Sequence, residues 1–305
     1  MYTTFISSSM VIDMDINKIL TNKRMSMALI GLAKEKFEEL LLCFDQVLLN
    51  HLENKKRKRI VGGGRKGNIK EARQKLFFIL FYMKNYPTYD VAAFLFASSK
   101  TSTCDWVHDI LPILEKTLQR KLSLPKRQIR TPEEFFALFP FVKEVMLDGV
   151  ERPTVRRKNP TVQTKEYSGK KKRHTRKNII VTDSKKKILV FTPTKHGKIH
   201  DKRLLDKSVL HIPEEVAKIV DTGFQGLQKQ YANVFIPKKR SKYNPLTEVD
   251  RQMNKLISST RIVVENAIAG MKRFKVARDI YRNRTGIDDM FTLLSCGLWN
   301  FHLEK

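Results

Sequence analysis

The chain has 305 residues, with 59 Lys and Arg against 31 Asp and Glu, so its formal net charge is +28 at pH 7. This excess of positive charge is far larger than solubility requires, and it predicts a surface that binds phosphate. A hydrophobic fraction of 41% over this length supports buried cores in two domains, which argues against a ribosomal-type or merely supercharged chain. The composition therefore favours a folded protein that acts on nucleic acid.

Neither secretion nor a membrane span is expected. The first sixteen residues lack a positive region followed by a continuous apolar segment, and no stretch approaches the roughly 18 apolar residues of a membrane helix. The three cysteines are too dispersed for a zinc cluster and fit reduced thiols. We expect a cytoplasmic protein with no membrane partner.

The N-terminal region, residues 1–68, is predicted to hold a helix and a basic linker. Residues 32–49 place apolar side chains on one helical face: Leu32, Phe37, Leu40, Leu41, Phe44, Val47 and Leu48. Residues 54–67, NKKRKRIVGGGRKG, combine a basic run with three glycines, which resist regular packing. This segment either follows a phosphate backbone or forms a solvated loop.

Residues 69–140 are predicted to form a helical DNA-binding region that ends in a proline-containing connection. An apolar helix stops before Pro87, and Thr88 is suited to cap a second helix. The turn 97–100 leads into a third helix, whose inward stripe contains Trp106, Val107, Ile110 and Leu111. This spacing indicates a helix-turn-helix, with a purely structural bundle as the alternative. On the first interpretation, the residues that face DNA are Lys100, Thr101, Thr103 and Asp105.

Residues 141–305 are predicted to form an α/β (α+β) domain. Strand-like and helix-like segments follow in this order: strands at 142–148, 176–183 and 186–194, a helix at 201–210, a strand at 216–221, a short helix at 225–232, a strand at 233–237 and a long helix at 247–274. Three antiparallel strands, a crossover helix and two further strands match the order of a ribonuclease-H-like, mixed five-stranded sheet. In that order the first and fourth strands are neighbours, so their terminal aspartates meet.

Three carboxylates are the candidate catalytic residues. Asp148 and Asp221 each end an apolar strand-like run before a glycine turn, and Glu265 lies inside the long helix. Magnesium prefers oxygen ligands, and three carboxylates suffice when DNA oxygens and water complete the site. The pair His200–Asp201 opens a helix, where Asp201 is interpreted as a structural N-terminal cap.

Basic residues near these acids are predicted to contact phosphate. Arg261 and Lys272 share a helical face with Glu265, and the alternative is a set of surface ion pairs. The densest basic block is expected to line the DNA path and contains Lys170, Lys171, Lys172, Arg173, Arg176 and Lys177.

Three segments, MLDGVERP, VDTGFQGL and RIVVENAIAGMKRF, resemble the catalytic blocks of DDE transposases, in particular the IS5 insertion-sequence family and the related Harbinger-like group. The resemblance covers nearly the whole chain, since YSGKKKRHTRKNIIV and TYDVAAFLFASSKTSTCDWV are similar to the family's second-strand and helix-turn-helix regions. The last block keeps an R(3)E(6)K spacing as Arg261, Glu265 and Lys272. Ser258 stands where related families carry a tyrosine, and Cys104 and Asp105 stand where relatives often carry Ser and a basic residue.

The resemblance implies a transposase that binds terminal inverted repeats and catalyses DNA strand cleavage and strand transfer. Asp148, Asp221 and Glu265 would hold two Mg²⁺ (or Mn²⁺) ions. Its partners would be element-end and target DNA and further copies of itself, on the nucleoid of a bacterial cytoplasm. Two alternatives are a catalytically silent, domesticated DNA-binding relative and a nonspecific ribonuclease-H-like nuclease.

Overall fold

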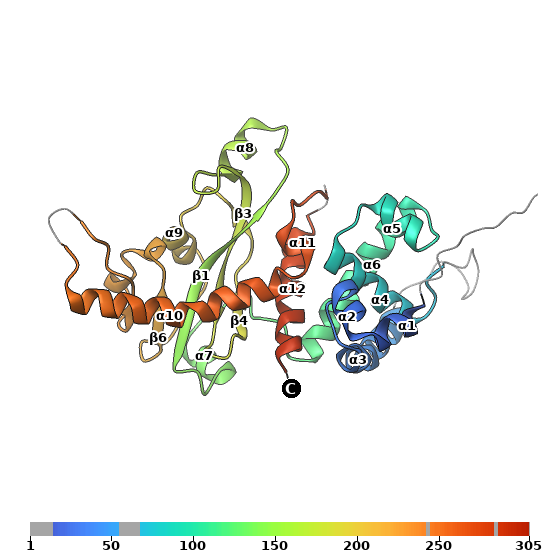
Figure 1. Cartoon of the computed structure of the whole chain (residues 1–305), viewed down its shortest axis with the longest axis horizontal. Helices are drawn as coiled ribbons and strands as arrows, with labels where there is room; N and C mark the ends of the chain where they lie inside the picture. Colours follow the sequence, from blue (N-terminus) through green and yellow to red (C-terminus); the bar gives the residue numbers. More distant parts are fainter. Residues whose placement is uncertain (1–14, 55–67, 242–244, 284–285, 305) are drawn as a thin grey trace, which may run out of the picture. The chain divides into compact units, whose positions relative to one another are not determined.

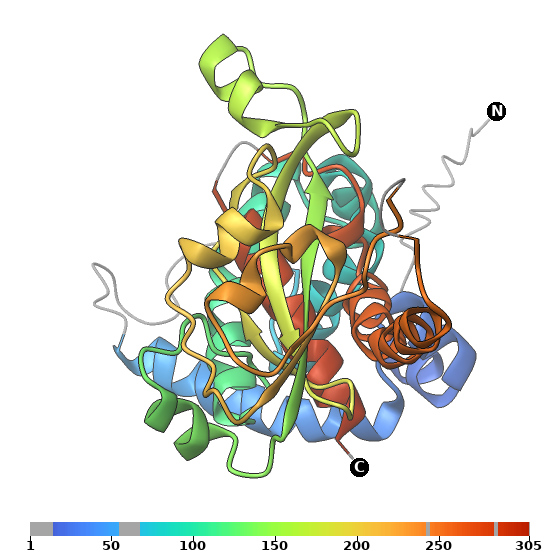
Figure 2. The ribbon, with the colours of Figure 1, turned by 90° about the vertical axis from the view of Figure 1, so that its left-hand side faces the viewer.

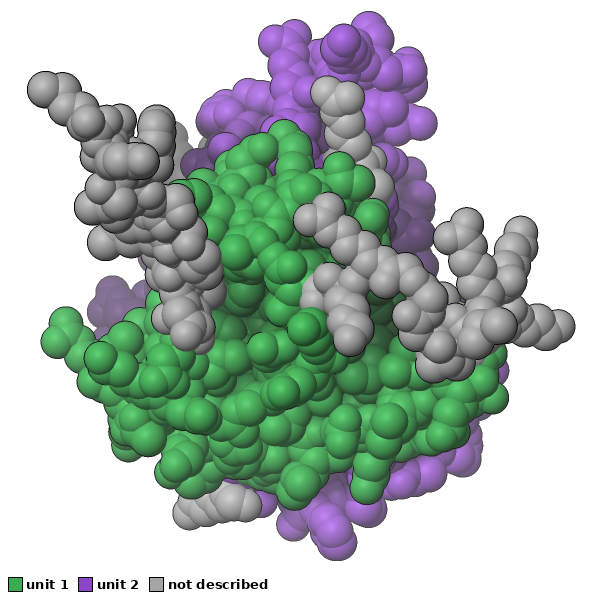
Figure 3. Space-filling view, turned by 90° about the vertical axis from the view of Figure 1, so that its right-hand side faces the viewer, with its two compact units in different colours: residues 1–120 green, residues 121–305 purple. Residues whose placement is uncertain are grey.

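The computed structural model describes residues 15–54, 68–241, 245–283 and 286–304. The chain divides into two compact units, residues 1–120 and 121–305, which are coloured separately in Figure 3. Residues 55–67 of the expected basic linker and residues 1–14 of the N-terminal segment lie outside the described residues. The functional boundaries proposed at residues 68 and 140 remain predictions.

The first unit is helical in all its described secondary structure (Figure 1). The predicted amphipathic helix is α3, and its residues Phe37, Leu40 and Phe44 are fully buried. The described helices of this unit are α1 (Ile16–Thr21), α2 (Lys23–Leu29), α3 (Lys34–Asn54), α4 (Ala72–Asn85), α5 (Tyr89–Leu95) and α6 (Lys100–Arg120).

Helices α4, α5 and α6 form the predicted three-helix arrangement. Helix α4 is followed by its C-cap residue Tyr86, which adopts a left-handed backbone with φ 48°, and Thr88 Oγ1 caps α5 by accepting from the Val91 amide at 3.2 Å. The Trp106 ring of α6 packs edge-on against Phe78 of α4, with 5.4 Å between centroids. Local capping and apolar patterning thus produced the elements that the sequence predicted.

The second unit is built on a mixed sheet. Strand β3 pairs antiparallel with β1 and β4, whereas β6 pairs parallel with β1 and β7 parallel with β6. The order β4-β3-β1-β6-β7 is the expected ribonuclease-H-like order. The strands are β1 (Glu144–Pro153), β3 (Arg173–Thr182), β4 (Ile188–Phe191), β6 (Ala217–Val220) and β7 (Val234–Phe235). Two short strands, β2 (Tyr167–Ser168) and β5 (Lys195–His196), also pair with β3, which gives seven described strands instead of five.

Side-chain alternation along the strands gives the sheet two apolar faces. On one face Leu147 packs with Leu204 of α9, and on the other Met146 packs with Val264 of α10. Figure 2 shows α9 in front of the strands and α12 behind them. The helical elements of this unit are α7 (Pro132–Leu138), α8 (Pro160–Glu166), α9 (Asp201–Asp206), the 3₁₀ turns η1 (Thr222–Phe224) and η2 (Leu227–Lys229), α10 (Glu248–Met271), α11 (Lys275–Arg278) and α12 (Asp288–Leu303).

Several elements differ from the sequence prediction. Strand β1 continues five residues beyond Asp148, because Gly149 pairs with Ile179 and the ladder runs on to Pro153. Asp148 therefore lies inside a strand, and Gly149 does not turn the chain. Helix α9 is shorter than expected, and the predicted short helix at 225–232 is a single 3₁₀ turn. No helix among the described residues is long and apolar enough to cross a bilayer.

Candidate active site

Parallel pairing of β1 and β6 brings the two predicted aspartates side by side. Leu147 is in register with Val220, so the next residue in each chain segment is an aspartate. Asp148 is part of β1, whereas Asp221 is the first residue after β6 and caps η1. The first and fourth main strands are neighbours, as predicted, and this places Asp148 and Asp221 at the same edge of the sheet.

Backbone amides fix the orientation of both carboxylates. The Gly149 amide donates to Asp148 Oδ1 at 2.7 Å, and the Thr222 amide donates to Asp221 Oδ1 at 2.6 Å. Both side chains remain partly exposed, at 20% and 30%. Both carboxylates are therefore held in place while part of each side chain stays accessible.

Arg261 of α10 lies between the two aspartates. Its Nη2 is 3.5 Å from Asp148 Oδ2, and its Nη1 is 3.6 Å from Asp221 Oδ1. Two nearby carboxylates repel each other, and the guanidinium compensates their charge. We expected Arg261 to contact phosphate, but in this structure it is the counter-charge of the aspartate pair.

Burial and neighbouring charge both act on Asp148. Loss of water raises the pKa of the Asp148 carboxyl above its usual range, and the charges of Asp221 and Asp201 raise it further. The Gly149 amide and Arg261 oppose this rise without cancelling it. The site therefore favours positive charge next to Asp148.

Glu265 lies on α10 four residues after Arg261, on the same side of the helix, and it is exposed. Among the described residues, no three His, Cys, Asp or Glu side chains lie close enough together to hold a metal ion. The structure thus brings together two of the three predicted carboxylates. The third is carried by the helix that already contacts them.

The donor set at this edge fits a divalent cation. Asp148 and Asp221 supply hard oxygen ligands, their orientations are fixed by amides, and a single guanidinium spans them both. A carboxylate pair that already shares one positive group is chemically suited to bind another in its place.

Lysines border the aspartate pair. Lys272 is the C-cap residue of α10, and burial lowers the pKa of its ammonium, with nearby Lys171 lowering it further and Asp148 raising it. Lys171 belongs to the exposed basic turn that leads from β2 into β3, defined by Lys170, Lys171, Lys172 and the first residue of β3, Arg173. The predicted basic block therefore reaches the candidate site through Lys171.

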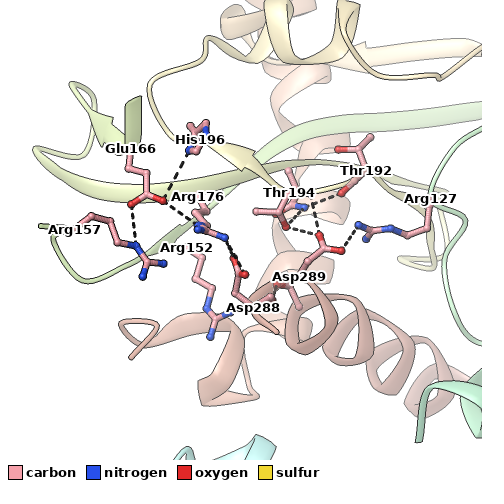
Figure 4. A network of polar contacts seen from close by, with 12 residues as sticks. Arg127, Arg152, Arg157, Glu166, Arg176, Thr192, Thr194, His196, Asp288 and Asp289 are labelled. Carbon is pink, nitrogen blue, oxygen red and sulfur yellow. Dashed lines mark hydrogen bonds and ion pairs between the residues drawn. The ribbon is translucent and has the colours of Figure 1, made fainter. Parts of the chain in front are cut away.

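Arg176 does not belong to this exposed turn. Its guanidinium pairs with Glu166 at 3.2 Å and with Asp288 at 2.9 Å, and both acids are buried (Figure 4). These pairs hold α8 and the start of α12 against β3. The expectation that Arg176 lines the DNA path is corrected accordingly, because the side chain points into an internal network.

The predicted DNA-facing residues of α6 differ in accessibility. Thr101 is exposed, and Lys100 is exposed while pairing with Asp90 at 2.9 Å. Thr103 is fully buried, and its hydroxyl donates to the Ser99 carbonyl at 3.0 Å. The prediction that Thr103 faces DNA is wrong for this structure, because its position falls on the inward stripe of the helix.

Asp201 belongs to the site, although the sequence led us to interpret it as a cap. His200 occupies the N-cap position of α9, and the Asp201 carboxylate instead faces Gly149 and Gly223. Those two glycines, one after Asp148 and two after Asp221, were the sequence signal, since glycine also marks close approach of another group. Lys177, predicted to line the DNA path, is buried and pairs with Asp201 at 3.1 Å.

Comparison with known proteins gives two family matches. The family described as DDE superfamily endonuclease matches residues 147–300, and the helix-turn-helix of DDE superfamily endonuclease matches residues 71–120. A probable transposase for insertion sequence element IS702 from Microchaete diplosiphon is 29% identical over 230 residues, covering 75% of this chain and 79% of that protein. No solved structure matches the chain. The first match contains both aspartates and α10, and the second contains α4 to α6.

Proposed function

Because the chain belongs to the DDE superfamily endonucleases and is a transposase-type enzyme with a helix-turn-helix DNA-binding domain, we propose that it catalyses metal-dependent DNA strand cleavage and strand transfer. The observation that carries the proposal is the aspartate pair at the edge of β1 and β6. Asp148 and Asp221 lie together, partly exposed, and share one guanidinium.

Asp148, Asp221 and Glu265 are the proposed metal ligands, with Mg²⁺ or Mn²⁺ as the ions and two as the expected number. A bound divalent ion supplies Lewis-acid activation of water or of a 3′-hydroxyl and neutralises charge at the phosphodiester. Glu265 joins the aspartates when α10, or its side chain, changes position. Support comes from the contact that α10 already makes through Arg261, one helical turn away.

Arg261 and the lysines bind DNA phosphate in this proposal. Arg261 compensates the aspartates in the free protein and transfers to phosphate when metal and DNA take its place. Lys171 and Lys272 hold the backbone beside Asp148, because the Lys272 ammonium lies within electrostatic range of both Lys171 and that carboxylate. No covalent bond between protein and DNA is needed.

Recognition of the terminal inverted repeats is assigned to the helix-turn-helix, with Lys100 and Thr101 as its proposed contacts. The exposed basic turn at 170–173 follows the backbone near the site. We place the protein with the IS5 group on the Arg261, Glu265, Lys272 spacing, and we expect a homo-oligomer on DNA because two element ends must be joined to one target.

The test is a cleavage and strand-transfer assay on labelled DNA that carries the element ends, with scrambled ends as the reference. We expect products with Mg²⁺ or Mn²⁺ and none with EDTA. Asp148→Asn, Asp221→Asn and Glu265→Gln should each remove the products while end binding persists. Glu248→Gln is the matched control, since Glu248 starts the same helix and pairs only with exposed Arg251 among the described residues.

Three other outcomes of this assay would contradict the proposed function. Full activity of an aspartate variant contradicts the proposed site. Equal cleavage of scrambled DNA identifies a nonspecific nuclease. End binding by the wild type without cleavage identifies a protein that only binds DNA.

A further inference from the structure

The carboxylate of Asp201 is wedged between the two segments that carry the catalytic aspartates. A methyl group at residue 149 would overlap Asp201 Oδ1, and one at residue 223 would lie 2.9 Å from Oδ2. Gly149 directly follows Asp148, and Gly223 lies two residues after Asp221. Neither glycine has positive φ, so close approach explains the missing side chains better than backbone freedom does.

Asp201 is held in this position by a buried lysine. Lys177 Nζ lies 3.1 Å from Asp201 Oδ1 and 3.1 Å from Glu151 Oε1, and it donates to the Ile199 carbonyl at 3.0 Å. Glu151 is fixed in turn by the Thr175 hydroxyl at 2.8 Å. The exposed fractions of the Lys177, Glu151 and Asp201 side chains are 6%, 7% and 14%, so the group is almost closed to water.

This group and Arg261 lie on opposite faces of the sheet. Glu151 and Lys177 are paired across β1 and β3, and Glu151 lies two residues from Gly149, so both point to the α9 side. Asp148 points to the other side, where α10 and Arg261 lie. Asp201 therefore contacts the aspartate pair only through the Gly149 and Gly223 segments, in addition to the effect of its charge on the pKa of Asp148.

We infer that Asp201 is a positioning residue of the active site: its carboxylate, held by Lys177, fixes the separation of the Gly149 and Gly223 segments and thereby the spacing of Asp148 and Asp221. The inference rests on the proposed metal-dependent function. It extends that function by a residue that touches neither DNA nor the reacting atoms.

Metal binding by the full chain tests this role without relying on activity. Mn²⁺ is titrated into wild type, Asp201→Ala, Asp201→Asn and the control Asp206→Ala, and free Mn²⁺ is measured by electron paramagnetic resonance. Asp206 is on the same helix and pairs with Lys202 on the surface. Loss of a group that orients metal ligands weakens metal affinity by about 10- to 100-fold, which is the expectation for Asp201→Ala.

The Asn variant separates positioning from direct ligation. Asn keeps the shape that fills the space beside both glycines and keeps an oxygen for Lys177, so its affinity should stay close to that of wild type. Asp206→Ala should bind as wild type does. An Asn variant as weak as the Ala variant would overturn the positioning role, and so would an Ala variant that binds normally.

Gly149→Ala gives a second, independent arm. The nearest atoms to a methyl group at residue 149 all belong to the Asp201 carboxylate. Gly149→Ala should therefore weaken Mn²⁺ binding in wild type and have little further effect in Asp201→Ala. Additive losses contradict the inference. If Asp201→Ala does not fold, the single variant Gly149→Ala decides the matter, because unchanged Mn²⁺ binding in it would contradict the inference. Absence of Mn²⁺ binding by wild type both without and with end DNA would reject the proposed function itself, whereas normal wild-type binding with unaffected Asp201 and Gly149 variants would reject the inference alone.

Discussion

The two faces of β1 carry two charge clusters of opposite character. On the α10 face, Arg261 reaches Asp148 and Asp221 at 3.5 and 3.6 Å, and the carboxylates are partly exposed. On the α9 face, Lys177 reaches Glu151 and Asp201 at 3.1 Å each, and the group is nearly closed to water. Long, accessible ion pairs open readily to admit a ligand, whereas short, buried ones are costly to break. Because side chains alternate along β1, the ion pairs that must open for metal and DNA lie on one face of the sheet. The ion pairs that must stay closed lie on the other face.

The largest effect is expected on the α10 face. Asp148→Asn or Asp221→Asn removes a metal carboxylate, an interaction worth several kcal/mol, so cleavage should fall on the order of 10³-fold or more. Single-turnover cleavage rates measure this loss. Each variant should still unfold cooperatively on heating, which shows that it is folded. A variant that cleaves at the wild-type rate would show that its substituted residue is not part of the site.

On the α9 face, the leading effect should be on stability. Lys177→Met leaves Glu151 and Asp201 as buried, uncompensated carboxylates, which is expected to cost about 3–5 kcal/mol of unfolding free energy. Urea unfolding followed by circular dichroism measures it. The control is Arg251→Met, whose pair with Glu248 is exposed and should change stability by roughly 0–1 kcal/mol. Similar losses for both variants would contradict the distinction between closed and open pairs.

A smaller effect on stability is expected where α10 packs against α12. A methyl group on Gly270 would overlap the Trp299 ring of α12, so Gly270→Ala should lower stability by about 1–3 kcal/mol through overpacking. At an uncrowded helical glycine, substitution by alanine would instead raise the stability by about 1 kcal/mol. The sign of the change therefore shows whether this position is crowded. Gly169→Ala, which meets nothing within 4 Å, is the control for thermal unfolding.

The smallest effect concerns phosphate. Lys171→Ala should weaken DNA binding modestly and reduce the slope of log K against log salt by about one, if Lys171 neutralises one phosphate. Fluorescence anisotropy across a salt series measures the slope. Lys185, exposed at the other end of β3, is the matched control. An unchanged slope for Lys171→Ala would exclude its phosphate contact.

Much of this arrangement was predictable from local patterns. The strand order that joins Asp148 to Asp221 follows from apolar runs and crossover lengths, and the Thr88 cap follows from residue type. The pairings of Arg261, Arg176 and Lys177 were not predictable, because their partners lie far away in sequence on neighbouring strands and helices. Thr103 was misplaced although the sequence held the signal, because it lies four residues before Val107 and therefore on the same inward stripe of the helix.

Asp201 and Glu265 show most clearly what could not be predicted from the sequence. A carboxylate at a helix start is already explained as a cap. The residues next to Asp201 in the sequence therefore gave no sign of its contact with two distant glycines. Glu265 was identified by its spacing from Arg261 and Lys272, yet that spacing does not determine how close α10 brings it to the aspartates.

Iron-directed cleavage of the polypeptide tests the metal centre most directly. Fe²⁺ takes the place of Mg²⁺, and with ascorbate and peroxide it generates hydroxyl radicals that cut the chain next to the bound ion. We expect cuts near residues 148 and 221, with a further cut near 265 when end DNA is added, all suppressed by excess Mg²⁺. Cuts elsewhere, or none near 148 and 221, would contradict the claim that this aspartate pair binds the catalytic metal.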